Sequence, residues 1–298
     1  MTSGTAEEIE AITDKLLKDL KITEPPVSLE AVRDRIKVDL AYYSTAEAST
    51  FGNFLHSLRV KTHELLKKCE RLEDAWKNKT LRGFWSPDQN RILVDESLHD
   101  RKQRWVETHE IVHSLIPHHQ AYTLGDSKWT LSQSCQVQIE AEANYGTGRL
   151  LYLGDQYRER LLASELTLSH VRALGPAFGN SELSSLWRAV ETLDIPACGM
   201  WSVHPWCTKK PEAERIEHFM RSTMFCNQFA SVEAYYVYRK LTKVVGRLGI
   251  GPLGKAEVVL DDIAGNSHKF HFECFGNKYG VMTLGYHTTQ NAVRVAVK

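Results

Sequence analysis

The sequence feature that most constrains this chain is His109-Glu110-Ile111-Val112-His113, which places two imidazoles and a carboxylate within five residues. In an α-helix, side chains four positions apart lie on one face, about one turn from each other, so His109 and His113 can bind one metal ion. Glu110 lies between them and is placed to accept a proton from a water molecule on that ion. The pattern is typical of zinc peptidases.

The residues around this motif predict a helix that is largely buried. Asp100 is placed to cap its start, apolar residues recur on more than one side, and Pro117 ends it. A buried polar group without a partner destabilises a fold by roughly 1–3 kcal/mol. A bound metal supplies partners for the motif, so this context favours a metal site over a purely structural role.

A third metal ligand is offered by a second predicted helix, which contains Glu140 and Glu142. Glu140, Ala143 and Asn144 share one face at spacings of three and four residues, whereas Glu142 points elsewhere. The small Ala143 allows the two helices to approach closely, and Asn144 is placed to hydrogen-bond a ligand imidazole. We therefore assign the third ligand to Glu140 and keep Glu142 as the alternative.

These motifs resemble the ImmA/IrrE-type metallopeptidases, whose core reads HExxH and then, after a variable loop, ExEAN and a Leu-Leu pair. The corresponding residues here are 109–113, 140–144 and 150–151. Residues 25–32 resemble the helix that follows a Pro-Pro-Val entry in that family, and residues 91–94 resemble the strand before its metal helix. The resemblance extends over residues 5–195 and is strongest within 83–153.

The chain also departs from the family pattern. Val112 stands where a glycine is usual, Pro117 where another histidine is usual, Gly146-Thr147 where Phe-Ala is usual, and Tyr152-Leu153 where Met-Pro is usual. None of these departures removes a metal ligand. They bear on the shape of the substrate cleft.

The resemblance implies an α+β fold with a gluzincin-like core, in which a small sheet packs with the HExxH helix and the ligand helix. It implies Zn2+ held by His109, His113 and Glu140, and a metal-activated water that attacks a peptide bond with Glu110 as general base. Such a reaction also needs a hydrogen-bond donor that stabilises the negative charge on the attacked carbonyl oxygen. Four residues are equal candidates for this donor: Tyr145, Tyr152, His118 and His119.

The same resemblance implies a protein substrate, namely a DNA-binding repressor or another transcription regulator that is cut in a stress response. Two other classes stay open. One is a non-catalytic metal-binding sensor or partner-binding regulator on the same fold, and the other is a DNA-binding regulator.

The resemblance, together with the proline-containing segment between residues 195 and 211, predicts three domains. They are a metallopeptidase domain at 1–157, a helical, helix-turn-helix-like subdomain at 158–196, and an α+β domain at 197–298 with a sensing or partner-binding role. Residues 155–193 carry four basic and five acidic side chains. Because DNA binding requires neutralisation of phosphates, we do not expect this chain to bind DNA.

Composition agrees with a soluble enzyme. Lys and Arg number 37 and Asp and Glu number 37, so the net charge is zero and indicates no nucleic-acid or membrane partner. The chain starts without a basic segment followed by an apolar one, and no run approaches 18 apolar residues. The expected location is the cytoplasm.

Periodicity predicts the remaining elements. Helices are expected at 6–20, 29–36 with Ser28 as the cap, within 54–78, after Pro211 and from Ser231. A strand is expected at 38–43, a hairpin at 83–94, and C-terminal strands at 256–260, 268–274, 279–286 and 293–297. An exposed strand beside the metal helix would receive the substrate by main-chain pairing, and the sequence does not indicate which strand that is.

Overall fold

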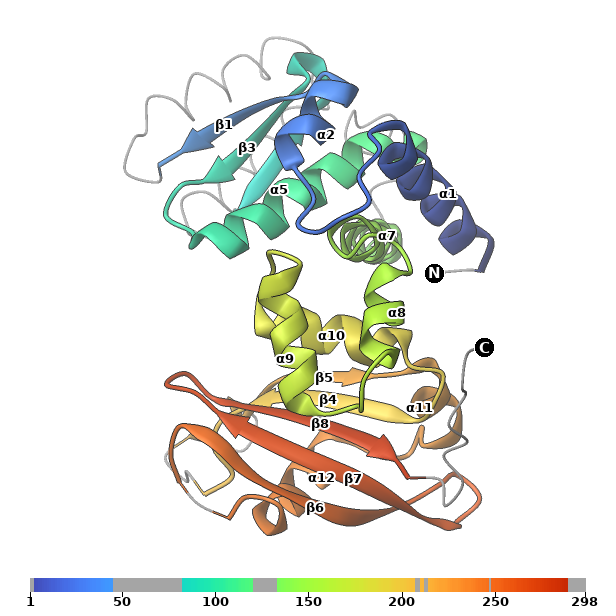
Figure 1. Ribbon diagram of the computed structural model, residues 1–298, viewed down its shortest axis with the longest axis vertical. Helices are drawn as coiled ribbons and strands as arrows, with labels where there is room; N and C mark the ends of the chain where they lie inside the picture. The colour runs from blue at the N-terminus through green and yellow to red at the C-terminus, as the bar shows by residue number, and fades with distance from the viewer. Residues whose placement is uncertain are drawn as a thin grey trace. The chain divides into compact units, whose positions relative to one another are not determined.

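The computed structural model describes residues 3–44, 82–119, 133–206, 210–211, 214–246 and 248–288. The chain divides into two compact units, one made of residues 1–157 with 177–180 and the other of 158–176 with 181–298. Each unit has its own β-sheet with helices packed on it, so the fold is α+β as predicted (Figure 1). The helices predicted within 54–78 and the strand predicted at 293–297 lie outside the described residues.

The first unit contains a three-stranded sheet in the order β1-β3-β2. β1 (Asp39–Tyr43) is parallel to β3 (Arg91–Asp95), and β2 (Gly83–Ser86) is antiparallel to β3. A single 3-10 turn, η1 (Pro87–Gln89), joins β2 to β3, and Asn90 ends it in the left-handed region at φ 48°. The predicted hairpin is confirmed, because turn-forming residues separate two short apolar runs.

The helices whose bounds fall within the described part of the first unit are α1 (Ser3–Asp19), α2 (Leu29–Ile36), α5 (Asp100–Leu115) and α7 (Gln133–Leu151). Ser28 caps α2 as predicted, since its side chain accepts a hydrogen bond from the Ala31 amide. The predicted cap of α5 is wrong by one residue. His99, rather than Asp100, accepts the hydrogen bond from the Arg101 amide, and Asp100 is the first helical residue.

Helix α5 ends where Pro117 predicts. Ile116 has extended geometry, at φ −90° and ψ 114°, because the residue before a proline is kept out of the helical region. The chain resumes helical geometry over residues 117–119. This break changes the direction of the chain directly after the second histidine of the motif.

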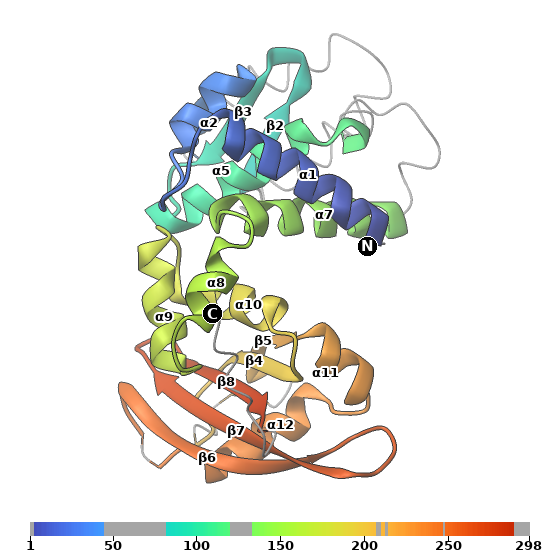
Figure 2. The ribbon, with the colours of Figure 1, turned by 45° about the vertical axis from the view of Figure 1, so that its right-hand side comes forward.

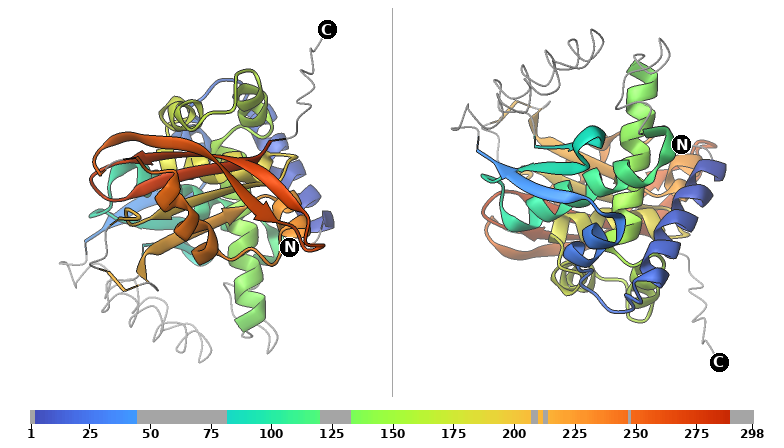
Figure 3. Two further views of the ribbon diagram at one scale, coloured as in Figure 1. Left: turned by 90° about the horizontal axis from the view of Figure 1, so that it is seen from below. Right: turned by 90° about the horizontal axis from the view of Figure 1, so that it is seen from above.

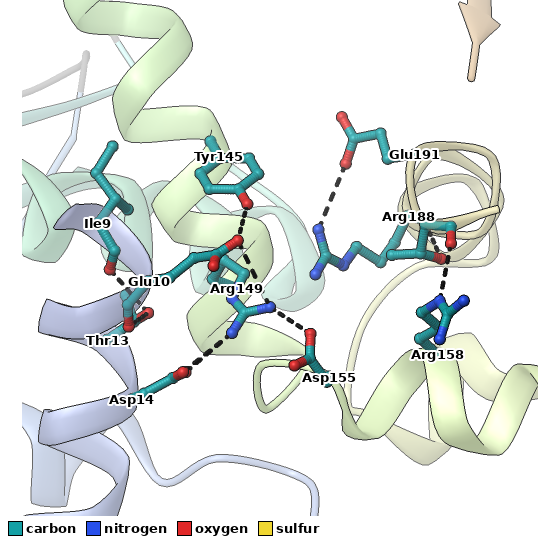
Figure 4. A network of polar contacts seen from close by, with 11 residues as sticks. Ile9, Glu10, Thr13, Asp14, Tyr145, Arg149, Asp155, Arg158, Arg188 and Glu191 are labelled. Atoms are coloured by element: carbon teal, nitrogen blue, oxygen red, sulfur yellow. Dashed lines mark hydrogen bonds and ion pairs between the residues drawn. The ribbon is translucent and has the colours of Figure 1, made fainter. Parts of the chain in front are cut away.

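Helix α7 packs against both α1 and α5, and Figure 2 shows α1 running along it. Ile9, Val112, Ile116 and Ala143 form a buried apolar cluster between the three helices. Arg149 of α7 supplies a polar link at the same interface, because its guanidinium pairs with Asp14 at 3.1 Å and with Asp155 at 2.6 Å (Figure 4). These contacts hold the helix that carries Glu140 in a defined position.

The second unit is built on an antiparallel five-stranded sheet in the order β5-β4-β8-β7-β6. Its strands are β4 (Ala197–Ser202), β5 (Ile216–Arg221), β6 (Gly251–Asp261), β7 (Ser267–Gly276) and β8 (Val281–His287). Its helices are α8 (Gln156–Leu162), α9 (Leu168–Ala177), α10 (Glu182–Thr192), α11 (Thr223–Gln228) and α12 (Ala234–Lys240), followed by the 3-10 turn η3 (Leu241–Lys243). Of the four C-terminal strands predicted, the three that fall within the described residues are confirmed.

Helices cover both faces of this sheet. Successive residues of a strand point to opposite faces, and β4 shows this directly. Cys198 and Met200 belong to the apolar core under α11 and α12, whereas Gly199 faces Leu186 and Val190 of α10. Figure 3 shows α12 in front of the sheet when it is seen from below. The second unit is therefore a helix–sheet–helix sandwich.

One predicted element of this unit is wrong. The acidic residues after Pro211 predict a helix, but the chain forms β5 over Ile216–Arg221. The strand results from pairing with β4, in which Met200 lies opposite Phe219, and that pairing is a contact between distant residues that local pattern does not reveal. Among the helices that the structure describes, none is long and apolar enough to cross a membrane.

Candidate metal centre

Three predicted ligands meet at one point of the first unit. His109 and His113 come from α5 and Glu140 from α7, and their ligating atoms all lie within 4.8 Å of one another. The Nε2 atoms of the two histidines are 3.1 Å apart, and His109 Nε2 is 3.2 Å from Glu140 Oε2. Tetrahedral zinc with ligands at about 2.0–2.1 Å requires ligand atoms about 3.3 Å from each other. These donors therefore fit a tetrahedral metal ion in both type and spacing.

The alternative ligand, Glu142, lies elsewhere. Its carboxylate is fully buried, with an exposed fraction of 0%, and receives hydrogen bonds from His118 Nε2 at 2.6 Å, His119 Nε2 at 3.0 Å and Gln138 Nε2 at 2.8 Å. Glu140 faces His109 and His113 instead, and its side chain is half exposed. The two carboxylates of the Glu-Ala-Glu segment thus take part in different clusters.

Glu110 lies beside the convergent donors rather than among them. The Trp85 amide on β2 donates a hydrogen bond to its carboxylate, and a Cβ built on Gly83 would lie 3.2 Å from its Oε1. Burial raises the pKa of Glu110 to about 7, helped by the negative charge of Glu140 and opposed by His109 and the Trp85 amide. The carboxylate is therefore held between the three convergent side chains and the edge of the sheet.

His109, His113 and Glu140 shift one another's pKa values. Burial acts to lower the pKa of His109, but its hydrogen bond to Glu140 and the charges of Glu110 and Glu140 outweigh burial and raise it. Burial and the charge of His109 hold the pKa of His113 well below its ordinary value. The hydrogen bond from His109 is the main cause that lowers the pKa of Glu140. The hydrogen bond between His109 and Glu140 thus shifts the pKa values of its two partners in opposite directions.

Each of the two motif histidines, His109 and His113, has a further polar partner. Asn144 hydrogen-bonds His109 through its side chain, which is the contact that the helical spacing predicts. His113 Nδ1 lies 3.0 Å from His119 Nδ1, and His119 is fully buried. Such partners orient metal-binding imidazoles and set which nitrogen carries the proton. Sequence reasoning missed this role of His119, because the break at Pro117 decides where residues 118 and 119 point.

The four residues considered for oxyanion stabilisation all have other packing or hydrogen-bond partners. Tyr152 is fully buried and packs on Tyr157, and Tyr145 donates its hydroxyl hydrogen bond to Glu10 of α1. His118 and His119 both contact Glu142. His119 is also hydrogen-bonded to one of the three convergent donors, because its Nδ1 lies 3.0 Å from His113 Nδ1.

Strand β2 is an edge of the sheet, as far as the described strands go, and it contacts α5. The Asp95 amide donates to the Arg82 carbonyl, so the alternation of the antiparallel ladder turns the peptide groups of Gly83 and Trp85 away from β3. The hydrogen bond from the Trp85 amide to Glu110 agrees with this register. The outward peptide groups of β2 therefore face the side on which the general-base candidate lies.

Comparison with known proteins adds evidence on the fold. A solved structure of a Mycobacterium tuberculosis transcriptional regulator matches with a TM-score of 0.50 and 14% sequence identity, covering 94% of this chain and 75% of that chain. The two share a fold. At that identity the likeness does not extend to activity. No protein-family model and no curated protein matches the chain.

Proposed function

We propose that this chain is a zinc-dependent endopeptidase with a gluzincin-like core, which hydrolyses a peptide bond in a protein partner. The observation that carries the proposal is the arrangement of four side chains. His109, His113 and Glu140 converge as donors, and Glu110 lies next to them without joining them. Structural zinc sites close with four protein ligands, whereas catalytic sites use three and leave one position open. Within the described residues three donors converge, which is the number that catalytic zinc sites use.

The side chains divide the chemistry among them. A zinc ion bound by His109, His113 and Glu140 would polarise a carbonyl group and make water more acidic. Glu110 accepts the proton of the attacking water and passes it to the leaving amine, which is general base and then general acid catalysis. Asn144 keeps the His109 ring oriented.

Strand β2 supplies the place for the substrate. An extended peptide can pair with the outward peptide group of Gly83 and the outward carbonyl of Trp85, since the Trp85 amide is already donated to Glu110. Main-chain pairing gives affinity with little demand on sequence. Because Glu110 lies at this edge, a peptide paired with β2 is brought alongside the convergent donors. Specificity then comes from the side chains of the partner protein and the surfaces around them.

The partner that we propose is a DNA-binding regulator that is cleaved in the cytoplasm in response to stress, as the motif resemblance implies. The fold shared with a transcriptional regulator favours one further candidate function. In that second function the chain binds the metal and the partner protein and regulates transcription without cleaving a peptide bond.

The test compares wild type with Glu110→Gln, each loaded with zinc and incubated with the protein encoded by the adjacent gene. Mass spectrometry of the products measures cleavage, and a metal assay measures zinc per chain. We expect Glu110→Gln to keep its zinc and to cleave at least about a hundredfold more slowly. Glu107→Gln is the matched control, since Glu107 lies on the same helix but pairs with Arg33 at 2.8 Å.

Each outcome separates the candidates. Undiminished cleavage by Glu110→Gln would remove Glu110 from the mechanism. Wild type that binds one zinc ion per chain and leaves the partner intact would favour the non-cleaving regulator. Loss of cleavage in Glu107→Gln to the same degree as in Glu110→Gln would show that the helix, rather than the carboxylate, is responsible.

A further inference from the structure

A second group of metal-type side chains lies next to the proposed zinc centre. His118, His119 and Glu142 place their ligating atoms within 4.8 Å of one another. This group is joined to the first by the 3.0 Å contact between His113 Nδ1 and His119 Nδ1. It therefore either binds a second ion or supports the first, and the protons on the histidines distinguish these two roles.

Metal binding by His113 fixes which of its ring nitrogens carries the proton. A neutral imidazole carries one N–H, and the nitrogen that binds a metal must be the other one. His113 turns Nε2 toward His109 at 3.1 Å and toward Glu140 at 3.9 Å. With Nε2 on the metal, the proton of His113 is on Nδ1, and it is donated to His119.

The state of His119 follows from that contact. Its Nδ1 accepts the hydrogen bond from His113, so its own proton is on Nε2, which lies 3.0 Å from Glu142 Oε2. Glu142 is fully buried, and Gln138 donates to its other oxygen at 2.8 Å. Every group in the series His113–His119–Glu142 thus has a matching donor or acceptor in one arrangement of protons.

A metal ion on His119 would require the opposite arrangement. Binding through His119 Nε2 places the His119 proton on Nδ1, and His113 Nδ1 must then accept it. The His113 proton moves to Nε2, and that nitrogen no longer binds the first ion. With neutral imidazoles, the two groups therefore cannot hold ions through His113 Nε2 and His119 Nε2 at the same time.

We propose that His119 and Glu142 are positioning residues that fix the protonation of His113 so that its Nε2 faces the metal, an inference that rests on the proposed zinc centre. The relay has three steps: Glu142 accepts from His119, His119 accepts from His113, and His113 presents its lone pair to the ion. His118 contacts the same carboxylate oxygen but is half exposed and lies outside the relay.

The experiment measures zinc affinity by competition with a chelating dye. Replacement of partners of this kind weakens metal binding by about 10–100-fold, and we expect that loss in His119→Leu and in Glu142→Gln. His119→Gln should bind zinc more tightly than His119→Leu, because its amide can accept from one neighbour and donate to the other. His118→Ala is the matched control and should stay within about threefold of wild type.

Two further measurements separate positioning from a general loss of structure. Urea unfolding of each zinc-free variant reports whether the fold is kept. Nitrogen-15 spectra of zinc-loaded wild type should show a proton on Nδ1 of His113 and on Nε2 of His119. The reverse assignment would overturn the relay.

The outcomes distinguish this inference from the proposed function. Wild-type affinity in folded His119→Leu would overturn the relay and leave the zinc centre intact. Two zinc ions per wild-type chain, one of them lost in His118→Ala, would overturn the relay in favour of a second metal site. Failure of wild type to bind zinc would overturn the centre itself and the relay with it.

Discussion

Val112 on α5 packs directly against Gly146 on α7, so closely that a Cβ built on Gly146 would lie 2.6 Å from Val112 Cγ1. Both positions depart from the pattern of the metallopeptidases that the sequence resembles, with a larger residue than usual at 112 and a smaller one than usual at 146. The two residues fill one space between the helices, so the large side chain at 112 is matched by the absence of a side chain at 146. They belong to the helix interface beside Ile9 rather than to the metal donors.

This contact predicts a non-additive pair of substitutions. Gly146→Ala should lower the free energy of unfolding by about 1–3 kcal/mol through overpacking. Val112→Ala should lower it by a similar amount through lost packing, roughly 1–3 kcal/mol. In the double variant the smaller side chain makes room for the new methyl group, so the combined loss should be less than the sum. Urea unfolding of the four proteins measures the difference, and strict additivity would contradict the contact.

Glu140→Gln should lower zinc affinity much more than any change at Glu142. Removal of one ligand from a zinc site that binds with about 10–16 kcal/mol removes on the order of a thousandfold in affinity. Glu142→Gln, which changes only a supporting group, should lose about 10–100-fold. Dye competition measures both affinities, and a larger loss in Glu142→Gln would move the third ligand to that residue.

Gly83→Ala should reduce cleavage while zinc affinity stays unchanged. The new Cβ would lie 2.3 Å from Val106 Cγ1 on α5, so β2 must shift and weaken the Trp85–Glu110 hydrogen bond. A displacement of about 1 Å in a catalytic group lowers the rate by about a hundredfold. Val106→Ala in the same chain should restore part of the rate, and its failure to do so would show that another contact is responsible.

Arg149 should matter more for stability than Arg158, although both guanidiniums contact carboxylates. Figure 4 shows the carboxylates around Arg149. The Arg149 side chain is buried at 5% exposed and lies near three acidic residues, so Arg149→Leu leaves their charges unpaired. The carboxylates are partly exposed, which limits the expected loss to about 1–3 kcal/mol. Arg158→Leu should change the unfolding free energy by less than about 1 kcal/mol, and equal losses would refute the distinction.

Glu273 should stabilise the second unit at neutral pH, and this contribution should be lost in acid. Burial acts to raise its pKa, but hydrogen bonds from the Leu168 amide and His271 and the charge of Lys255 outweigh burial and lower it. A lowered folded pKa contributes stability above the unfolded pKa, about 4.3, and this contribution is lost as the pH falls through the folded pKa.

Glu273→Gln should therefore be less stable than wild type by about 1–3 kcal/mol at neutral pH. The difference in unfolding free energy between wild type and Glu273→Gln should become smaller below about pH 4.3. Urea unfolding across the pH range gives the curve. Glu257→Gln is the control, since its ion pair with Lys269 is exposed and contributes less than about 1 kcal/mol. A difference that does not change with pH would contradict the assignment.

Sequence predicted best where the determinants are local. Helix α5, the Ser28 cap and the hairpin at 83–94 follow from residues a few positions apart, and so does the shared face of Glu140 and Asn144. Strand β5 and the contact between His113 and His119 were not predicted. The first depends on pairing with β4 and the second on the chain direction after Pro117, and both are fixed only by contacts between distant parts of the fold.

The second unit's chain returns briefly to the first unit, and this limits how the protein can be dissected. Phe178 packs against both Tyr152 and Tyr157, and Asn180 donates to the Leu151 carbonyl. A fragment that stops at residue 157 would expose the two tyrosine rings that Phe178 covers. An independently expressed first unit therefore needs a graft of residues 177–180 or a substitute for Phe178, and a clean cut after 157 would produce an aggregation-prone surface.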